Sequence, residues 1–138
     1  MSQESVARAH DAYEVLDRAV ETRSFDRFFA DFSHPDVEWV PLAGTVDSTA
    51  VRQGYAAMKE RLTEMFAAMD EPRIAAEEFI EAGVRIVVAV RVSGRGKASG
   101  AHVDTRWFHV LTERDGKAVR IEWYATRAEA LKAVGLEE

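Results

Sequence analysis

Residues 104–126, DTRWFHVLTERDGKAVRIEWYAT, decide the fold of this chain. The stretch is typical of two antiparallel strands joined by a tight turn at Asp115-Gly116. His109 lies in the middle of the first predicted strand, among large apolar residues. The register of the hairpin decides which way His109 points, because a slip of one residue turns every side chain to the opposite face.

Two turns are compatible with this sequence. A two-residue loop places His109 opposite Glu122 and mixes polar with apolar residues on both faces. A three-residue loop, 114–116, with Gly116 in the left-handed conformation, places His109 opposite Ile121. It makes one face nearly all apolar, so burial favours it and we predict it. The other predicted pairs on that face are Leu111 with Val119, Trp107 with Trp123, and Thr105 with Ala125.

In the rest of the chain, the spacing of apolar residues distinguishes predicted helices from predicted strands. Apolar residues spaced three and four positions apart predict three helices. The first covers 5–22, the second is short and follows Ser24 as its N-cap, and the third covers 49–69. A short strand is predicted in 37–45, ending near Pro41, and longer strands over 73–83, 84–94, 101–113 and 117–125. A short helix in 126–136, ended by Gly135, closes the chain. Helices followed by meandering strands predict an α+β fold, with helices on one face of a curved sheet.

Length and composition narrow the class of protein. The 138 residues suit one domain, 1–138, and no cysteine is present, which excludes disulfides, thiolate metal sites and cysteine nucleophiles. A net charge of −6 argues against a nucleic-acid partner. The first residues do not form a signal peptide, and no apolar run approaches the ~20 residues that span a bilayer. We therefore expect no membrane partner and a cytoplasmic location.

His109 has two interpretations. In the first it is an interior histidine that bonds a hydroxyl, such as that of Tyr13 or Tyr55, or a backbone carbonyl. In the second it is a general acid or base in a pocket, since burial should lower its pKa and a neutral imidazole both donates and accepts. A metal site with His102 and Asp104 is not expected, because strand alternation points those two side chains away from His109.

Three segments resemble the SnoaL-like branch of the nuclear transport factor 2-like superfamily: SFDRFFADF (24–32), VEWVPLAG (37–44) and GRGKASGAHVDTRWFHVLTERDGKAVRIEWYATRAEALKAVGL (94–136). The resemblance covers nearly the whole chain. It implies a cone, in which a curved antiparallel or mixed sheet wraps around three helices and encloses an apolar pocket. It also implies a homodimer through the outer face of the sheet, where Val87, Phe108 and Val110 favour burial.

The resemblance implies a fold more strongly than an activity. The family's polyketide cyclases place an acid/base aspartate where this chain has His109. The positions matching the isomerase site are about Leu16 and Val40, and those matching the epoxide hydrolase site are Val92, Val90 and Trp123, so neither chemistry is expected. Many relatives have an aspartate before the last helix, where this chain has Thr126.

We therefore expect a cone-fold protein that binds a small, mostly hydrophobic or aromatic molecule, without a cofactor or a metal. One alternative is a cyclase- or isomerase-like enzyme in which His109 transfers a proton and Tyr13 or Tyr55 stabilises an oxyanion. Another is a non-catalytic dimeric interaction module. The expected ligand-binding residues are Trp39, Met58, Leu62, Val88, Val90, Thr105, Trp107, Ile121 and Trp123.

Overall fold

The computed structural model describes residues 3–40 and 52–136. Its helices are α1 (Gln3–Thr22), α2 (Asp26–Phe32), α3 (Tyr55–Ala67) and α4 (Arg127–Ala133). Its strands are β1 (Ser33–Val40), β2 (Arg52–Gln53), β3 (Met69–Ala82), β4 (Arg85–Gly96), β5 (His102–Arg114) and β6 (Lys117–Tyr124). None of the helices within these residues has both the length and the apolar character needed to cross a bilayer.

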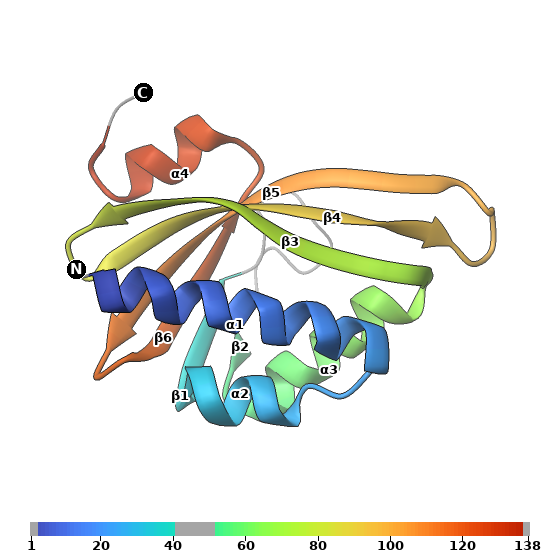
Figure 1. Ribbon diagram of the computed structural model, residues 1–138, viewed down its shortest axis with the longest axis horizontal. Helices are drawn as coiled ribbons and strands as arrows, with labels where there is room; N and C mark the ends of the chain where they lie inside the picture. The colour runs from blue at the N-terminus through green and yellow to red at the C-terminus, as the bar shows by residue number, and fades with distance from the viewer. Residues whose placement is uncertain (1–2, 41–51, 137–138) are drawn as a thin grey trace.

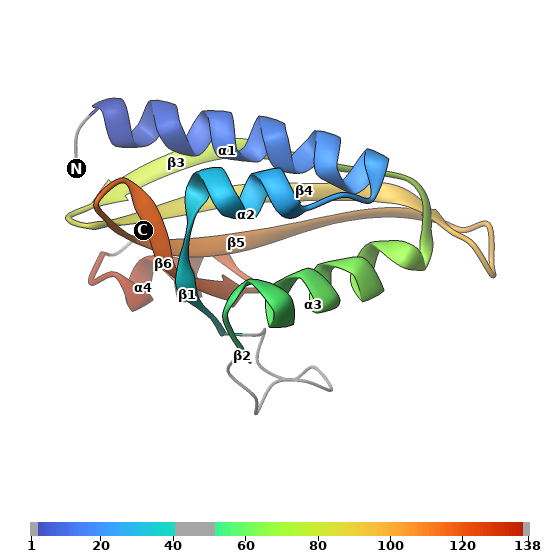
Figure 2. The same ribbon diagram turned by 90° about the horizontal axis from the view of Figure 1, so that it is seen from below.

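The strands form one mixed sheet in the order β2-β1-β6-β5-β4-β3. β1 runs parallel to β6, and all other neighbours are antiparallel. Helices α1, α2 and α3 lie on one face of this curved sheet, and α4 lies on the other (Figures 1 and 2). The predicted α+β fold, with a curved sheet wrapped around three helices, is confirmed.

Two helix starts differ from the prediction. The second helix does not use Ser24 as its N-cap: Phe25 holds that position and is buried in the core. The third helix begins at Tyr55 because Gly54 has a φ of 88° and the preceding residues 52–53 pair with β1 as β2. The predicted start of this helix at Thr49 lies outside the described residues.

The β5–β6 turn is also different from the predicted one. Arg114 pairs with Lys117, so the loop has two residues, and both Asp115 (φ 54°) and Gly116 (φ 80°) are left-handed. This is the geometry of a type I′ turn, for which Asp-Gly is a favoured sequence. The predicted three-residue loop is therefore wrong, although the predicted positive φ of Gly116 is confirmed.

The shorter turn alone would point the apolar side chains of β6 to the outer face, and a β-bulge at Val119 turns them inward again. Glu113 pairs with Ala118 and Thr112 with Arg120, which leaves Val119 as an extra residue in β6. Beyond it, the observed register differs from the predicted one by two residues, and a shift of two keeps every side chain on its face. The observed pairs are Leu111 with Ile121 and His109 with Trp123.

Hydrogen bonds of Asp17 and Arg23 hold α1 and α3 against the sheet. The carboxylate of Asp17 accepts hydrogen bonds from the guanidinium of Arg73 (2.7 Å) and the backbone N–H of Ile74 (2.9 Å). Burial acts to raise the pKa of Asp17, but these hydrogen bonds outweigh it and lower that pKa. Arg23, in a left-handed conformation, donates to the carbonyl of Phe66 in the last turn of α3 and to that of Met69, the first residue of β3.

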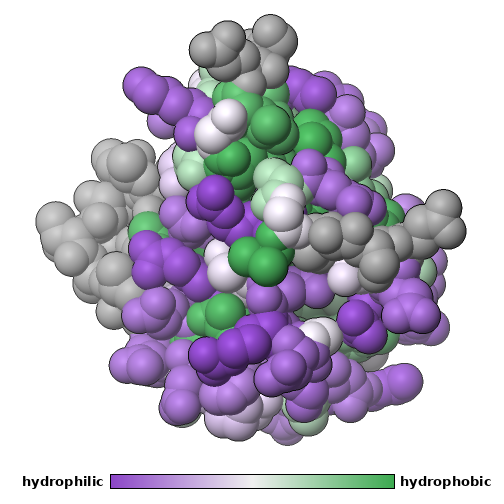
Figure 3. Space-filling model, turned by 90° about the vertical axis from the view of Figure 1, so that its left-hand side faces the viewer, coloured by the Kyte–Doolittle hydropathy of each residue, from purple (hydrophilic) through white to green (hydrophobic). Residues whose placement is uncertain are grey.

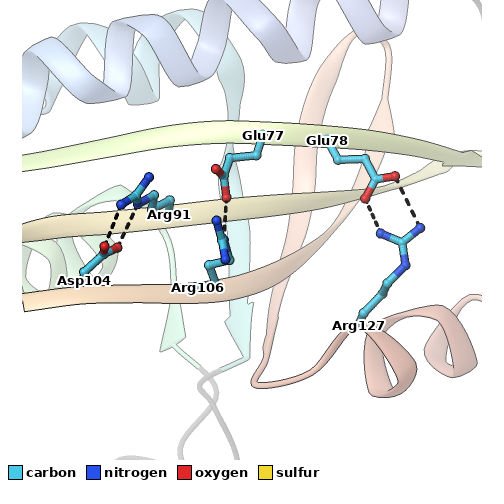
Figure 4. A network of polar contacts seen from close by, with 6 residues as sticks. All are labelled: Glu77, Glu78, Arg91, Asp104, Arg106 and Arg127. Carbon is cyan, nitrogen blue, oxygen red and sulfur yellow. Dashed lines mark hydrogen bonds and ion pairs between the residues drawn. The ribbon is translucent and has the colours of Figure 1, made fainter.

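The outer face of the sheet is divided between α4 and ion pairs. Ala130, Leu131 and Val134 pack over Val87 and Val110, which are almost fully buried. Ion pairs lie elsewhere on this face, among them Arg91–Asp104, Arg106–Glu77 and Arg127–Glu78, whose side chains come from β3, β4, β5 and α4 (Figure 4). The expectation that Val87 and Val110 favour a dimer is thus wrong, because α4 of the same chain covers them.

The bulge gives a direct test of the hairpin. Deletion of Val119 leaves a regular two-residue hairpin with all observed pairs intact, so we expect it to fold with a modest loss of stability. Deletion of Ile121 removes a core side chain and turns Arg120 toward the core, where an unpaired charge is costly, so we expect it to unfold. Thermal unfolding followed by near-UV circular dichroism distinguishes the two variants. Equal loss of structure in both would show that Val119 is not the extra residue.

Candidate ligand-binding site

A hydrogen bond between α1 and β5 lies at the centre of the candidate site. The inward face of β5 buries His109 to 3% exposure, and the inward face of α1 buries Tyr13. The Tyr13 hydroxyl lies 2.8 Å from Nδ1 of His109. The sequence named two tyrosines as possible partners, and the other, Tyr55, instead donates to the carbonyl of Ser33.

Burial keeps both groups of this pair neutral. Desolvation lowers the pKa of His109 to about 3 and raises the pKa of the Tyr13 hydroxyl. A base works best when its pKa lies near the working pH, so an imidazole with this pKa is a weak base at neutral pH. The neutral ring keeps its ability to donate a hydrogen bond.

The pair lines a cavity of about 60 Å3 between the three inner helices and the sheet. When the open space at its mouth is included, the free volume is about 680 Å3. Its walls are almost entirely apolar: the charged residues in the lining are Arg8 and Glu113. The other lining residues are Ala9, Ala12, Tyr13, Leu16, Phe28, Phe32, Ser33, Trp39, Met58, Leu62, His109, Leu111, Gly116, Ala118, Ile121 and Trp123.

Arg8 and Glu113 mark the part of the lining next to the β5–β6 turn. A Cβ atom added to Gly116 would lie 3.0 Å from Cζ of Arg8, so the guanidinium rests against the turn. Burial raises the pKa of Glu113 despite the opposing effect of the Arg8 charge. Figure 3 shows the end of the molecule that carries this turn: hydrophilic residues cover much of it, and hydrophobic ones gather near the top, over α4.

Trp123 joins the aromatic part of the lining. Its ring centroid lies 4.2 Å from that of His109 and 5.6 Å from that of Trp39. Trp39 reaches this position because β1 runs parallel to β6, with Trp39 opposite Ile121. Two buried side-chain atoms in this group have no hydrogen-bond partner, Nε1 of Trp39 and Nε2 of His109.

Seven of the sequence-predicted residues line the cavity together: Tyr13, Trp39, Met58, Leu62, His109, Ile121 and Trp123. Their roles in binding or catalysis stay predictions.

Five predicted residues do not belong to the lining. Val88 and Val90 are fully buried core residues. Tyr55 packs on the core beside Phe29. Thr105 and Trp107 lie beyond the last β5–β6 pair, Phe108 with Tyr124, because the true register is shifted by two residues.

The end of the cavity near the turn was not predicted from the sequence. Ala9 and Leu16 lie on the buried face of α1 and line the cavity, but neither was named as a pocket residue. Ala12 and Ala118 are small, and their size helps to leave the space open. The signal that was available is the run of small residues on the same helix face as Tyr13.

The structure also shows that Asp104 and His109 point to opposite faces of the sheet, as predicted. Asp104 lies on the outer face, where it pairs with Arg91, whereas His109 is buried and bonds Tyr13 of α1. His102 has the same alternation as Asp104 along β5. The described residues contain no group of three acidic, histidine or cysteine side chains placed to hold a metal ion.

Comparison with known proteins assigns the family. The model of the SnoaL-like domain matches residues 12–121, so the chain belongs to the SnoaL-like family. This confirms the resemblance seen in the sequence. No curated protein sequence matches the chain significantly.

Solved structures of similar fold support this assignment. TerC, co-crystallised with polyporic acid, is 25% identical, with 94% of this chain and 97% of that chain covered and a TM-score of 0.69. A nuclear transport factor 2-like protein of unknown function from Burkholderia pseudomallei K96243 is 24% identical, with 98% and 99% covered and a TM-score of 0.71. Another, from Anabaena variabilis ATCC 29413, is 16% identical, with 91% of each chain covered and a TM-score of 0.75.

The neutral state of His109 can be measured directly. Its pKa is about 3 in the folded protein and about 6.5 in an unfolded chain. Between these values the unfolded chain binds one more proton, so this contribution to stability is complete above about pH 6.5 and is lost on acidification, by about 1.4 kcal/mol per pH unit. We expect 15N NMR to show no titration of the folded ring above about pH 4.5, and the stability of His109→Gln to depend less steeply on pH. A folded-state titration near 6.5 would contradict burial of this ring.

Proposed function

We propose that this protein binds a small, mostly apolar molecule in the cavity beside the Tyr13–His109 pair. The observation that carries the proposal is the lining itself: apolar and aromatic walls surround the neutral Tyr13–His109 pair, and Ser33 adds one more uncharged polar side chain. Ligand pockets commonly combine apolar walls with a few placed polar groups. A charged ligand would lose its hydration there without gaining a counter-charge at the inner end.

The size of the cavity limits the ligand. The enclosed volume of about 60 Å3 is smaller than a cavity that holds benzene, ~150 Å3 in an engineered example, so even a single-ring ligand would extend into the open space on the Arg8 and Glu113 side. The co-crystallisation of TerC, 25% identical to this chain, with polyporic acid supports a small-molecule ligand for this member of the family.

An enzymatic role as a cyclase or isomerase is the second possibility. It requires His109 to accept a proton from carbon at neutral pH, which a pKa of about 3 opposes. Among the described residues, Glu113 is the carboxylate of the lining, and it lies next to the turn. The geometry thus favours ligand binding over proton abstraction by His109.

Binding can be tested with single-ring aromatic compounds. At ten times its dissociation constant, a ligand should stabilise the protein by about 1.4 kcal/mol, which raises Tm by a few degrees in a chain of this size. Ala12 is buried in the lining, so Ala12→Leu should fill the cavity and abolish the shift. Ala7 is exposed on the same helix, and Ala7→Leu is the matched control that should keep it.

In the same thermal-shift series, toluene, styrene and acetophenone serve as probes, and polyporic acid as a larger one. A failure of all four to raise Tm would contradict the proposal. An equal shift in the wild type and in Ala12→Leu would place binding elsewhere.

We also propose a homodimer, as the family resemblance implies. The part of the outer face that α4 leaves uncovered carries Arg91, Asp104, Arg106 and Glu77, so such an interface would be polar. Light scattering at micromolar concentration and low salt should give twice the chain mass. A single-chain mass at low salt would contradict the dimer.

A further inference from the structure

A groove lies at the surface between α1 and α2, which are neighbours in both views of the ribbon (Figures 1 and 2). Its free volume is about 210 Å3, which exceeds the ~150 Å3 of an engineered cavity that binds benzene. The apolar part of its lining consists of Val15, Ala19 and Phe28. The groove therefore has room for a single aromatic ring or a short alkyl chain.

The groove is separate from the inner cavity. Among the described residues, Phe28 is the one that lines both spaces. Its side chain is 8% exposed and packs against Phe29 and Phe32, with ring centroids 5.1 and 6.2 Å away. A molecule in the groove thus lies on the other side of Phe28 from the Tyr13–His109 pair.

The corner between α1 and α2 holds the groove in shape. Arg23 at this corner has a φ of 65° and donates hydrogen bonds to two backbone carbonyls outside both helices. Phe25 is the N-cap of α2, and no side chain makes a capping hydrogen bond there. The hydroxyl of Ser24, the predicted N-cap, lines the groove instead. A groove fixed in this way needs little ordering when a molecule binds.

The polar part of the lining is cationic. It consists of the guanidinium groups of Arg18 and Arg27 and the hydroxyl groups of Thr22 and Ser24, with no carboxylate among the described lining residues. The chain as a whole has a net charge of −6, so this groove has the opposite sign. Arg27 also lies 3.3 Å from Asp31, but the two side chains are 81% and 49% exposed. Such an ion pair is weak and leaves Arg27 able to bind another anion.

We propose that the α1–α2 groove binds a small amphipathic anion. Its ring or alkyl chain lies against Val15, Ala19 and Phe28, and its carboxylate or sulfonate group faces Arg18 and Arg27. Guanidinium groups bind such oxyanions through charge-assisted hydrogen bonds. Attraction between charges extends over about 8 Å at physiological salt, so both arginines contribute without touching the same oxygen. This site is separate from the inner cavity and does not depend on the proposed function.

The net charge also decides between two sources of such an anion. An anionic membrane presents many negative charges to the whole molecule, and a chain with a net charge of −6 is repelled by it. A free molecule presents its single charge only to the groove. The occupant is therefore a free small molecule.

The anion 4-methylbenzenesulfonate and the neutral 4-methylbenzenesulfonamide test the proposal, because they share one ring and nearly one shape. On addition of the sulfonate to 15N-labelled protein, we expect saturable shifts of the Nε–Hε signals of Arg18 and Arg27, assigned with the variants Arg18→Gln and Arg27→Gln. The signal of Arg8, which lines the inner cavity, should not move. The sulfonamide should move none of the three signals.

Variants give a second readout by calorimetry. The affinity for the sulfonate should fall about threefold in Arg18→Gln and in Arg27→Gln, as expected for the loss of one exposed ion pair, and it should fall at high salt. Arg8→Gln is the matched control, because it removes the same charge from another exposed side chain of α1 and should keep the affinity. Ala12→Leu, which fills the inner cavity, should keep it too.

Three results would overturn this inference without touching the proposed function. Shifts that grow linearly over many arginine signals would show unspecific pairing. A loss of affinity in Arg8→Gln or Ala12→Leu, but not in the groove variants, would place the anion in the inner cavity. Sedimentation of the protein with phosphatidylserine vesicles that requires Arg18 and Arg27 would assign the groove to a lipid surface.

Discussion

The hydrogen bond between Tyr13 and His109 is the contact on which the candidate site depends. It joins the helix layer to the sheet through two neutral groups in an apolar interior. Because it occupies Nδ1, it leaves Nε2 as the one free position of the ring. The same bond therefore joins α1 to the sheet and places a neutral polar pair in the largely apolar lining of the cavity.

This contact is possible only because the hairpin turns His109 inward. A type I′ turn alone would pair His109 with Glu122, which faces the opposite side in the observed register. The extra residue Val119 restores the inward face for Ile121 and Trp123. The bulge thus places the apolar side chains of β6 beside the imidazole, and that apolar environment is what lowers its pKa.

Much of this arrangement could be predicted from the sequence. The periods of 3.6 and 2 located most of the helices and strands, and the need to bury apolar side chains gave the correct inner face of the hairpin. The turn was wrong because a β-bulge has no strong local signal: the predicted loop and the observed turn with its bulge bury the same side chains. The outer face was misjudged because the packing of α4 over Val87 and Val110 is a long-range contact. The cavity could be located only in part, since its end near the turn depends on small residues such as Ala12 and Ala118.

The most direct test is a crystal structure of the protein with iodobenzene, whose iodine atom is located by anomalous scattering. A molecule bound in the cavity predicts an iodine peak among Tyr13, Leu62 and Trp123, with the imidazole of His109 still bonded to Tyr13. An iodine peak only at surface sites, with the cavity closed by rearranged side chains, would contradict the account.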